Sequence, residues 1–68
     1  MNLRLEPTLA AGSAWRVDVC TGNRKRGTLR TAPVTDAVYT LAQAQTFCRN
    51  NRASDFADAL RGVEEAQS

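Results

Sequence analysis

The amino-acid sequence predicts a small α+β fold, in which an antiparallel sheet of two or three strands is followed by two helices packed on one face of the sheet. Two observations support this prediction. Apolar and polar residues alternate in the first half of the chain, whereas from Thr35 onward the apolar residues recur about every 3.6 positions. The chain has 68 residues, which is enough for one domain at most. We therefore expect a single domain, with strands and a basic hairpin in residues 1–34 and two helices in residues 35–68.

The clearest strand is Trp15–Cys20, in which every second residue is a large apolar one. A shorter strand, Leu3–Glu6, precedes it, and Pro7 either ends this strand or places it at a sheet edge. Successive side chains of a strand point to opposite faces, so the clearer strand has two chemically different faces. One face carries Trp15, Val17 and Val19, and the other carries Arg16, Asp18 and Cys20.

Residues 21–27 interrupt the alternation and read as a hairpin loop with a basic tip, because Gly and Asn tolerate the positive φ angles of tight turns. Residues 28–32 then predict a second, weaker strand. Pro33 ends its ladder, since proline has no amide donor. We expect the apolar face of the sheet to be completed by Leu3, Leu5 and Leu29.

The first helix has two possible starts. Thr35 is one candidate N-cap, and Thr40 with Gln43 three residues later is an alternative capping box. With the later start, Val38 and Tyr39 would belong to a strand or a lead-in. We favour the earlier start. On a helical wheel one face then carries Ala37, Val38, Leu41, Ala44, Gln45 and Cys48, while Phe47 flanks it and Tyr39, Gln43 and Thr46 point away.

The second helix follows a polar break at residues 49–53. Ser54 is the expected N-cap, and the helix is expected to begin at Asp55. Its apolar stripe has the spacing i, i+3, i+4, i+7 and consists of Phe56, Ala59, Leu60 and Val63. We expect residues 64–68 to form a loose tail.

The residue inventory argues against an enzyme. The chain has no His, no Gly-rich phosphate loop and no cluster with metal-ligand spacing, so we expect no catalytic residue, no cofactor and no metal. Cys20 and Cys48 lack zinc spacing and are expected to be free thiols, with Cys48 on an apolar helix face. The chain contains no run of about 18 apolar residues, which a membrane span would need. Its first residues also lack the apolar core of a signal peptide. We therefore expect a cytoplasmic protein with no membrane partner.

The net charge of +2 hides an asymmetry between the two halves of the chain. Residues 1–34 carry six cations and two acids, whereas residues 35–68 carry three cations and five acids. If Val17 and Leu29 face the helices, then three arginines point out of the opposite sheet face, where they join the cations of the hairpin tip. The candidate binding surface is therefore Arg4, Arg16, Arg24, Lys25, Arg26 and Arg30, with the exposed Tyr39 as a second candidate contact.

An arginine-rich surface suits an acidic partner, because guanidinium groups form bidentate contacts with carboxylates and phosphates. A protein partner is the leading prediction, and nucleic acid is the alternative. The chain itself is expected to be a monomer or a homodimer. Its small size and missing catalytic inventory predict a non-catalytic protein-binding module.

Two resemblances refine this prediction. The order of a short strand and two helices resembles ribbon-helix-helix repressors, with 28–32 as the ribbon, 36–50 and 54–65 as the helices, and Phe56–Arg61 similar to the second helix of that family. This resemblance implies a dimeric DNA-binding regulator. However, Trp15–Cys20 is expected to pair with the ribbon segment, whereas that family needs the ribbon free to enter the major groove with a second subunit.

The second resemblance is to small phage anti-CRISPR inhibitors. Residues 37–44 resemble the passage from sheet to helix in some of these proteins, and the size and layout of the chain are similar to theirs. That family has no shared catalytic motif. The resemblance implies a phage or mobile-element inhibitor that blocks a host macromolecular complex, here through the arginine-rich sheet face.

Overall fold

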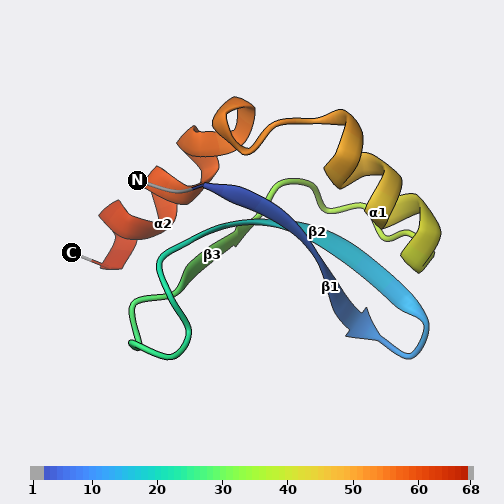
Figure 1. The fold of residues 1–68 in the computed structure, drawn as a ribbon, viewed down its shortest axis with the longest axis horizontal. Coiled ribbons are helices and arrows are strands. Elements are labelled where there is room, and N and C mark those ends of the chain that lie inside the picture. The colour runs from blue at the N-terminus through green and yellow to red at the C-terminus, as the bar shows by residue number, and fades with distance from the viewer. Residues whose placement is uncertain (1–2, 68) are drawn as a thin grey trace.

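The computed structural model describes residues 3–67 of the chain (Figure 1). Along the chain, all three strands come before the helices. An antiparallel three-stranded sheet is followed by two α-helices, the second of which is preceded by a 3₁₀ turn. This arrangement confirms the predicted α+β fold. The elements are β1 (Arg4–Ala11), β2 (Ala14–Thr21), β3 (Arg30–Pro33), α1 (Leu41–Asn50), η1 (Ala53–Phe56) and α2 (Ala57–Gln67).

The central strand is β2, which pairs with β1 on one side and β3 on the other. The edge strand β1 is longer than the predicted Leu3–Glu6 and continues through Pro7, which lies opposite Val17. An edge strand tolerates proline because one row of its amides has no partner strand. Of the two roles predicted for Pro7, the edge position is therefore correct.

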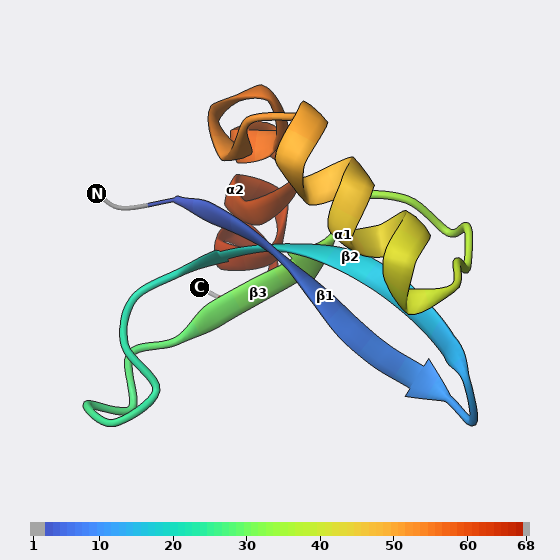
Figure 2. The same cartoon turned by 45° about the vertical axis from the view of Figure 1, so that its right-hand side comes forward.

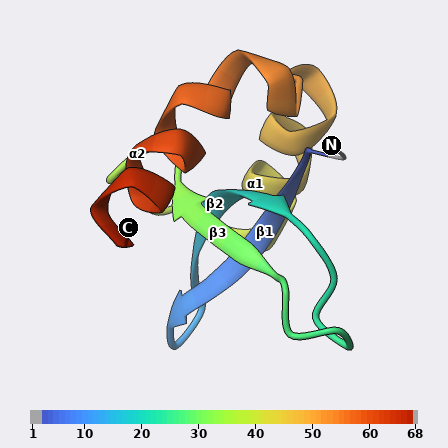
Figure 3. The same ribbon diagram turned by 90° about the vertical axis from the view of Figure 1, so that its left-hand side faces the viewer.

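Both helices cover the same face of the sheet (Figures 1 and 3). α1 packs on β1 and β2, whereas α2 packs on β3 and β2. Leu3 and Leu5 contribute to the core as predicted, but Leu29 lies in the loop before β3, and Ala32 takes its place. The buried centre of the core consists of Val19, Ala32, Ala53 and Leu60, and Leu3, Leu5, Val34, Phe56, Ala59 and Val63 pack around it.

The favoured start of the first helix, at Thr35, is wrong. The helix begins at Leu41, and Thr40 is its N-cap in a complete capping box. The amide of Gln43 donates to Thr40 Oγ1 at 3.2 Å, and the amide of Thr40 donates to Gln43 Oε1 at 3.0 Å. Before the cap an extended segment leads from β3 into α1 (Figure 2). In it, Tyr39 exchanges two backbone hydrogen bonds of 2.8 and 2.7 Å with Trp15. These bonds use both the N–H and the C=O group of Tyr39, so neither group needs a partner within a helix.

Replacing Thr40 with alanine is expected to lower the free energy of unfolding by about 1 kcal/mol, because the side-chain acceptor of the capping box is lost. Thr35→Ala is the matched control. Its hydroxyl accepts one bond, from the Ala37 amide, and caps no helix. The control should cost less than about 0.5 kcal/mol. Urea unfolding followed by circular dichroism measures both, and a larger loss for Thr35→Ala would contradict this assignment.

The second helix also begins differently from the prediction. The segment that was expected to start at a Ser54 cap forms η1, and the α-helix begins at Ala57. Arg52 occupies the cap position of η1, where its amide donates to Asp55 Oδ2 at 3.3 Å. The prediction of a loose tail is wrong for residues 64–67, because α2 continues to Gln67. Ser68 lies outside the described residues. Glu, Ala and Gln are good helix formers, so they sustain the helix past Gly62.

Candidate functional site

The sheet face that the helices leave open carries acids as well as arginines. Alternation and register place Arg4 opposite Cys20, Glu6 opposite Asp18, and Arg16 on the same face. Two carboxylates that face each other directly across strands would repel, so each needs a cation. The face supplies one for each acid: Arg4 Nε lies 2.8 Å from Glu6 Oε1, and Arg16 Nε lies 3.1 Å from Asp18 Oδ1.

These two ion pairs remove most of the positive charge that the sequence analysis expected on this face. Asp18 is the more deeply placed acid, with a side chain only 4% exposed. Its Oδ1 is near Arg16 Nε but accepts no hydrogen bond of good geometry from the part of the chain described here. Arg16 therefore compensates the charge of Asp18 by proximity. Arg4 and Arg16 are thus each paired with an acid on this face of the sheet.

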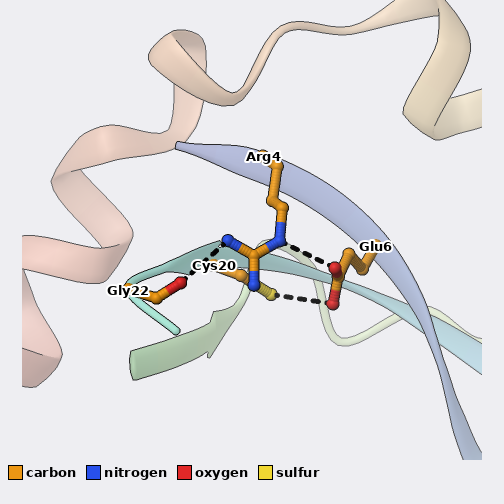
Figure 4. A network of polar contacts seen from close by, with 4 residues as sticks. All are labelled: Arg4, Glu6, Cys20 and Gly22. Carbon is orange, nitrogen blue, oxygen red and sulfur yellow. Dashed lines mark hydrogen bonds and ion pairs between the residues drawn. The ribbon is translucent and has the colours of Figure 1, made fainter. Parts of the chain in front are cut away.

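Arg4 is also the centre of a small polar network (Figure 4). Besides its bond to Glu6, it donates through Nη1 to the carbonyl of Gly22 at 3.3 Å, just after the end of β2. The thiol of Cys20 donates to Glu6 Oε2 at 3.6 Å. The hydrogen bond from Arg4 lowers the pKa of Glu6, because it stabilises the carboxylate. The network joins the first strand to the loop after the second strand.

The two cysteines are free thiols, as the sequence predicted. Burial is the main cause that raises the pKa of Cys20 to about 11, and the nearby carboxylate of Glu6 adds to the effect. Burial also raises the pKa of Cys48, which is less deeply enclosed. Since the thiolate is the reactive form, neither cysteine has the environment of a nucleophile.

We expect the two thiols to react with a disulfide reagent in separate phases at pH 8. At that pH a thiol with the pKa of Cys20 is ionised in about one molecule in a thousand, and it is also buried. Cys48 should therefore react first, and Cys20 only after unfolding. Reaction followed by absorbance measures this order, and Cys48→Ser should remove the first phase. A rapid phase that survives in Cys48→Ser would show that Cys20 is accessible.

Arg30 does not share the open face, so the single arginine-rich surface that was predicted is wrong. Arg30 lies opposite Thr21 in the register of β2 and β3, and Ala32 lies opposite Val19. Ala32 belongs to the core, so Arg30, two residues earlier, is on the helix-covered face of the sheet. The prediction placed Leu29 on that face. A change of one residue in parity moves every side chain of a strand to the other face.

The remaining predicted cations form what we call the basic loop, Arg24, Lys25 and Arg26. All three are exposed, and none makes an ion pair with a residue in the described range 3–67. The loop is ordered by its neighbours: the amide of Lys25 donates to Asn23 Oδ1 at 2.8 Å, and the amide of Asn23 donates to Thr28 Oγ1 at 2.9 Å. Three adjacent cations are therefore held on a defined turn at one end of the molecule (Figure 1).

Tyr39 is half-buried rather than fully exposed, because its ring packs against Phe47 with the ring centroids 6.0 Å apart. The two rings line a shallow hollow of about 470 Å³ on the outer side of α1. The sequence analysis did not predict this hollow, although Tyr39, Gln43 and Thr46 were placed away from the apolar helix face. The other lining residues are Ala42, Gln43, Thr46, Asn50 and Asn51.

Comparisons with protein-family models, with curated proteins and with solved structures find no match to this chain. Within residues 3–67, no group of three or more Cys, Asp and Glu side chains could hold a metal ion. In the same range no helix has the length and apolar character needed to cross a membrane. The surfaces themselves therefore carry the functional argument.

Proposed function

We propose that this chain is a small non-catalytic binding module that recognises an acidic protein surface through the basic loop. The observation that carries the proposal is the state of the three cations Arg24, Lys25 and Arg26, which are exposed and make no ion pair within the described residues. Guanidinium groups in this state can form bidentate contacts with carboxylates of a partner. Because the loop is already ordered, less conformational entropy is lost when it binds.

Arg4 supports this loop indirectly. Its contact with the Gly22 carbonyl holds the point where the chain leaves β2, and its ion pair with Glu6 fixes the guanidinium in place. Arg4 is therefore a positioning residue in the proposed interaction. The proposed surface is smaller than the one predicted from the sequence, because Arg16 is paired with Asp18 and Arg30 lies on the other sheet face.

A protein partner is favoured over DNA by the position of β3. In a ribbon-helix-helix regulator the ribbon strand pairs with that of a second subunit and enters the major groove. In this chain β3 is hydrogen-bonded to β2 along Arg30–Pro33. The more specific hypothesis, a phage inhibitor that blocks a host complex, stays a prediction. The basic loop supports binding to an acidic surface, and it does not identify the partner.

The test compares two triple variants that remove the same charge. The first replaces Arg24, Lys25 and Arg26 with alanine, and the control replaces Arg49, Arg52 and Arg61, which are exposed cations of the helical half. The probe is a fluorescein-labelled peptide of alternating Glu and Ser, titrated at low and moderate salt by anisotropy. The loop variant should lose about tenfold to a hundredfold in affinity, and the control should lose less than about threefold.

A labelled duplex DNA of equal charge is titrated in parallel. Equal losses in the two variants would mean that net charge alone drives binding, and absence of peptide binding even at low salt would overturn the proposal. Tight and saturable binding to one DNA sequence, lost in the loop variant, would show that the basic loop binds DNA and would support the DNA-binding alternative.

A further inference from the structure

The sheet has two outer edges, one on β1 and one on β3, because β2 is the central strand. Within residues 3–67 no further strand pairs with either edge. The outward backbone groups of an edge strand can pair with a strand of another molecule, so open edges lead to self-association unless something blocks them. The hydrogen bonds of β2 reveal which residues of β1 and β3 direct their backbone groups outward.

Pro7 stands at an outward position of the β1 edge. The amide of Val34 donates to the carbonyl of Val17 at 3.0 Å, so the backbone groups of Val17 point toward β3. In an antiparallel sheet the backbone groups of one residue point to the same side, and successive residues alternate between the two sides. Val17 therefore makes no ladder hydrogen bond to β1. Its partner in that register is Pro7, whose nitrogen is directed away from β2.

Pro33 stands at an outward position of the β3 edge for the same reason. It lies opposite Asp18, the neighbour of Val17 in β2. Since the backbone groups of Val17 point toward β3, those of Asp18 point toward β1. Pro33 therefore makes no ladder hydrogen bond to β2, and its nitrogen is also directed outward. Each edge thus has a proline at a position where any other residue would offer an amide donor.

Irregular backbone beyond each proline limits the edges further. On β1 the register shifts between Leu9 and Ala11. After β3 the chain returns to β2 only at the bridge before α1, and residues 35–38 have only Arg16 opposite them. The extra residues cannot stay in the ladder, so the edge does not continue as a regular strand. Prolines and irregular segments are two of the means by which natural sheets prevent edge-to-edge pairing.

We propose that Pro7 and Pro33 close the edges of the sheet, so that this chain does not join other chains by strand pairing. A missing N–H removes a hydrogen bond that an added strand would need. In a two-fold pair the loss is doubled, because the same position of both chains lies in the contact. The inference concerns the sheet edges and holds whether or not the basic loop binds an acidic partner.

Pro7→Thr tests the β1 edge, because it restores an outward donor and introduces a residue that favours strands. A two-fold pair of β1 edges would gain one hydrogen bond from each chain, so the dissociation constant of the pair should fall at least about thirtyfold relative to wild type. Sedimentation velocity of the full chain between about 10 µM and 1 mM covers weak pairs of this kind. Circular dichroism checks that the variant keeps the wild-type fold.

Thr8→Val is the matched control. It also adds a strand-favouring residue to β1, but its amide lies on the β2 side, opposite Arg16. Its self-association should stay within about threefold of wild type, since no outward donor is added. Pro33→Thr alone tests the shorter β3 edge in the same way and should also strengthen pairing.

The variant with both Pro7→Thr and Pro33→Thr should differ in kind. A chain with one open edge closes as a dimer, whereas a chain with two open edges can add partners on both sides. We therefore expect a dimer from Pro7→Thr and elongated assemblies that bind thioflavin T from the double variant. Amide hydrogen exchange locates the contact. Leu5 and Leu9 lie on the same edge as Pro7, and their amides should become protected as the concentration of Pro7→Thr rises.

Three results would overturn the proposal. The first is a pair of folded single variants, Pro7→Thr and Pro33→Thr, that associate no more than wild type. The second is an equal gain in association from Thr8→Val, which would assign the effect to strand propensity. The third is wild-type protein in which the amides of Leu5 and Leu9 gain the same protection as concentration rises, because its β1 edge would then be open. A double variant that assembles no further than Pro7→Thr would remove Pro33 from the proposal.

Discussion

Leu60→Ala is expected to lower the free energy of unfolding by about 3 kcal/mol, within the usual range for a buried leucine. Leu60 is 2% exposed and belongs to the buried centre of the core with Val19, Ala32 and Ala53. Two of these neighbours are alanines and cannot extend into the space left by the missing side chain. A domain of this size has few other core residues to compensate. A large fraction of the variant should therefore be unfolded at room temperature.

Urea titration with tryptophan fluorescence measures this loss, since the chain has a single Trp. Leu9→Ala makes the same chemical change at an exposed site of β1 and should cost less than about 0.5 kcal/mol. Both variants are measured at the same low micromolar concentration. Equal losses would show that the packing of α2 on the sheet is not the source of stability.

Gly22→Ala is expected to cost about 3 kcal/mol and to displace the basic loop. Gly22 has φ +86°, a region that side chains with a Cβ rarely adopt, and an added Cβ would collide with the backbone carbonyl of Thr28. The carbonyl belongs to the main chain and cannot rotate away as a side chain would. The loop must therefore move, and with it the contact of Arg4 with Gly22.

Gly27→Ala is the matched control in the same loop. Gly27 has φ +72°, but an added Cβ would meet no atom within 4 Å, so only the backbone cost of about 1 kcal/mol applies. Thermal unfolding compares the two variants, and the acidic-peptide titration reports the loop itself. Gly22→Ala should weaken peptide binding more than Gly27→Ala. Equal effects on both readouts would contradict the close approach of Gly22 to Thr28.

The patterns that the sequence predicted correctly are those that depend on neighbouring residues. Alternation in Trp15–Cys20 located β2, and the spacing of Phe56, Leu60 and Val63 located the apolar stripe that runs from η1 into α2. The capping box of Thr40 and Gln43 was also visible in the sequence, as the less favoured of two helix starts. In each case the physical cause is the local geometry of a strand or helix, which repeats over two to four residues.

The candidate site was harder to predict, because a count of charges does not say which of them pair. Arg4 pairs with Glu6 and Arg16 with Asp18, each two residues apart on the same face of one strand. The basic loop was predicted because its cations are consecutive. The bridge between Trp15 and Tyr39 was not predicted, since it joins two residues that are distant along the chain.

The sequence by itself determined that strands come first and two α-helices follow, and it located the basic loop, because periodicity and turn chemistry are properties of adjacent residues. Tertiary structure alone decided where the first helix begins and which sheet face Arg30 occupies. The hydrogen bonds between Trp15 and Tyr39 keep the lead-in extended up to Thr40. The pairing of β3 with β2 sets the parity of Arg30, and parity is fixed by strand register, which no local pattern encodes.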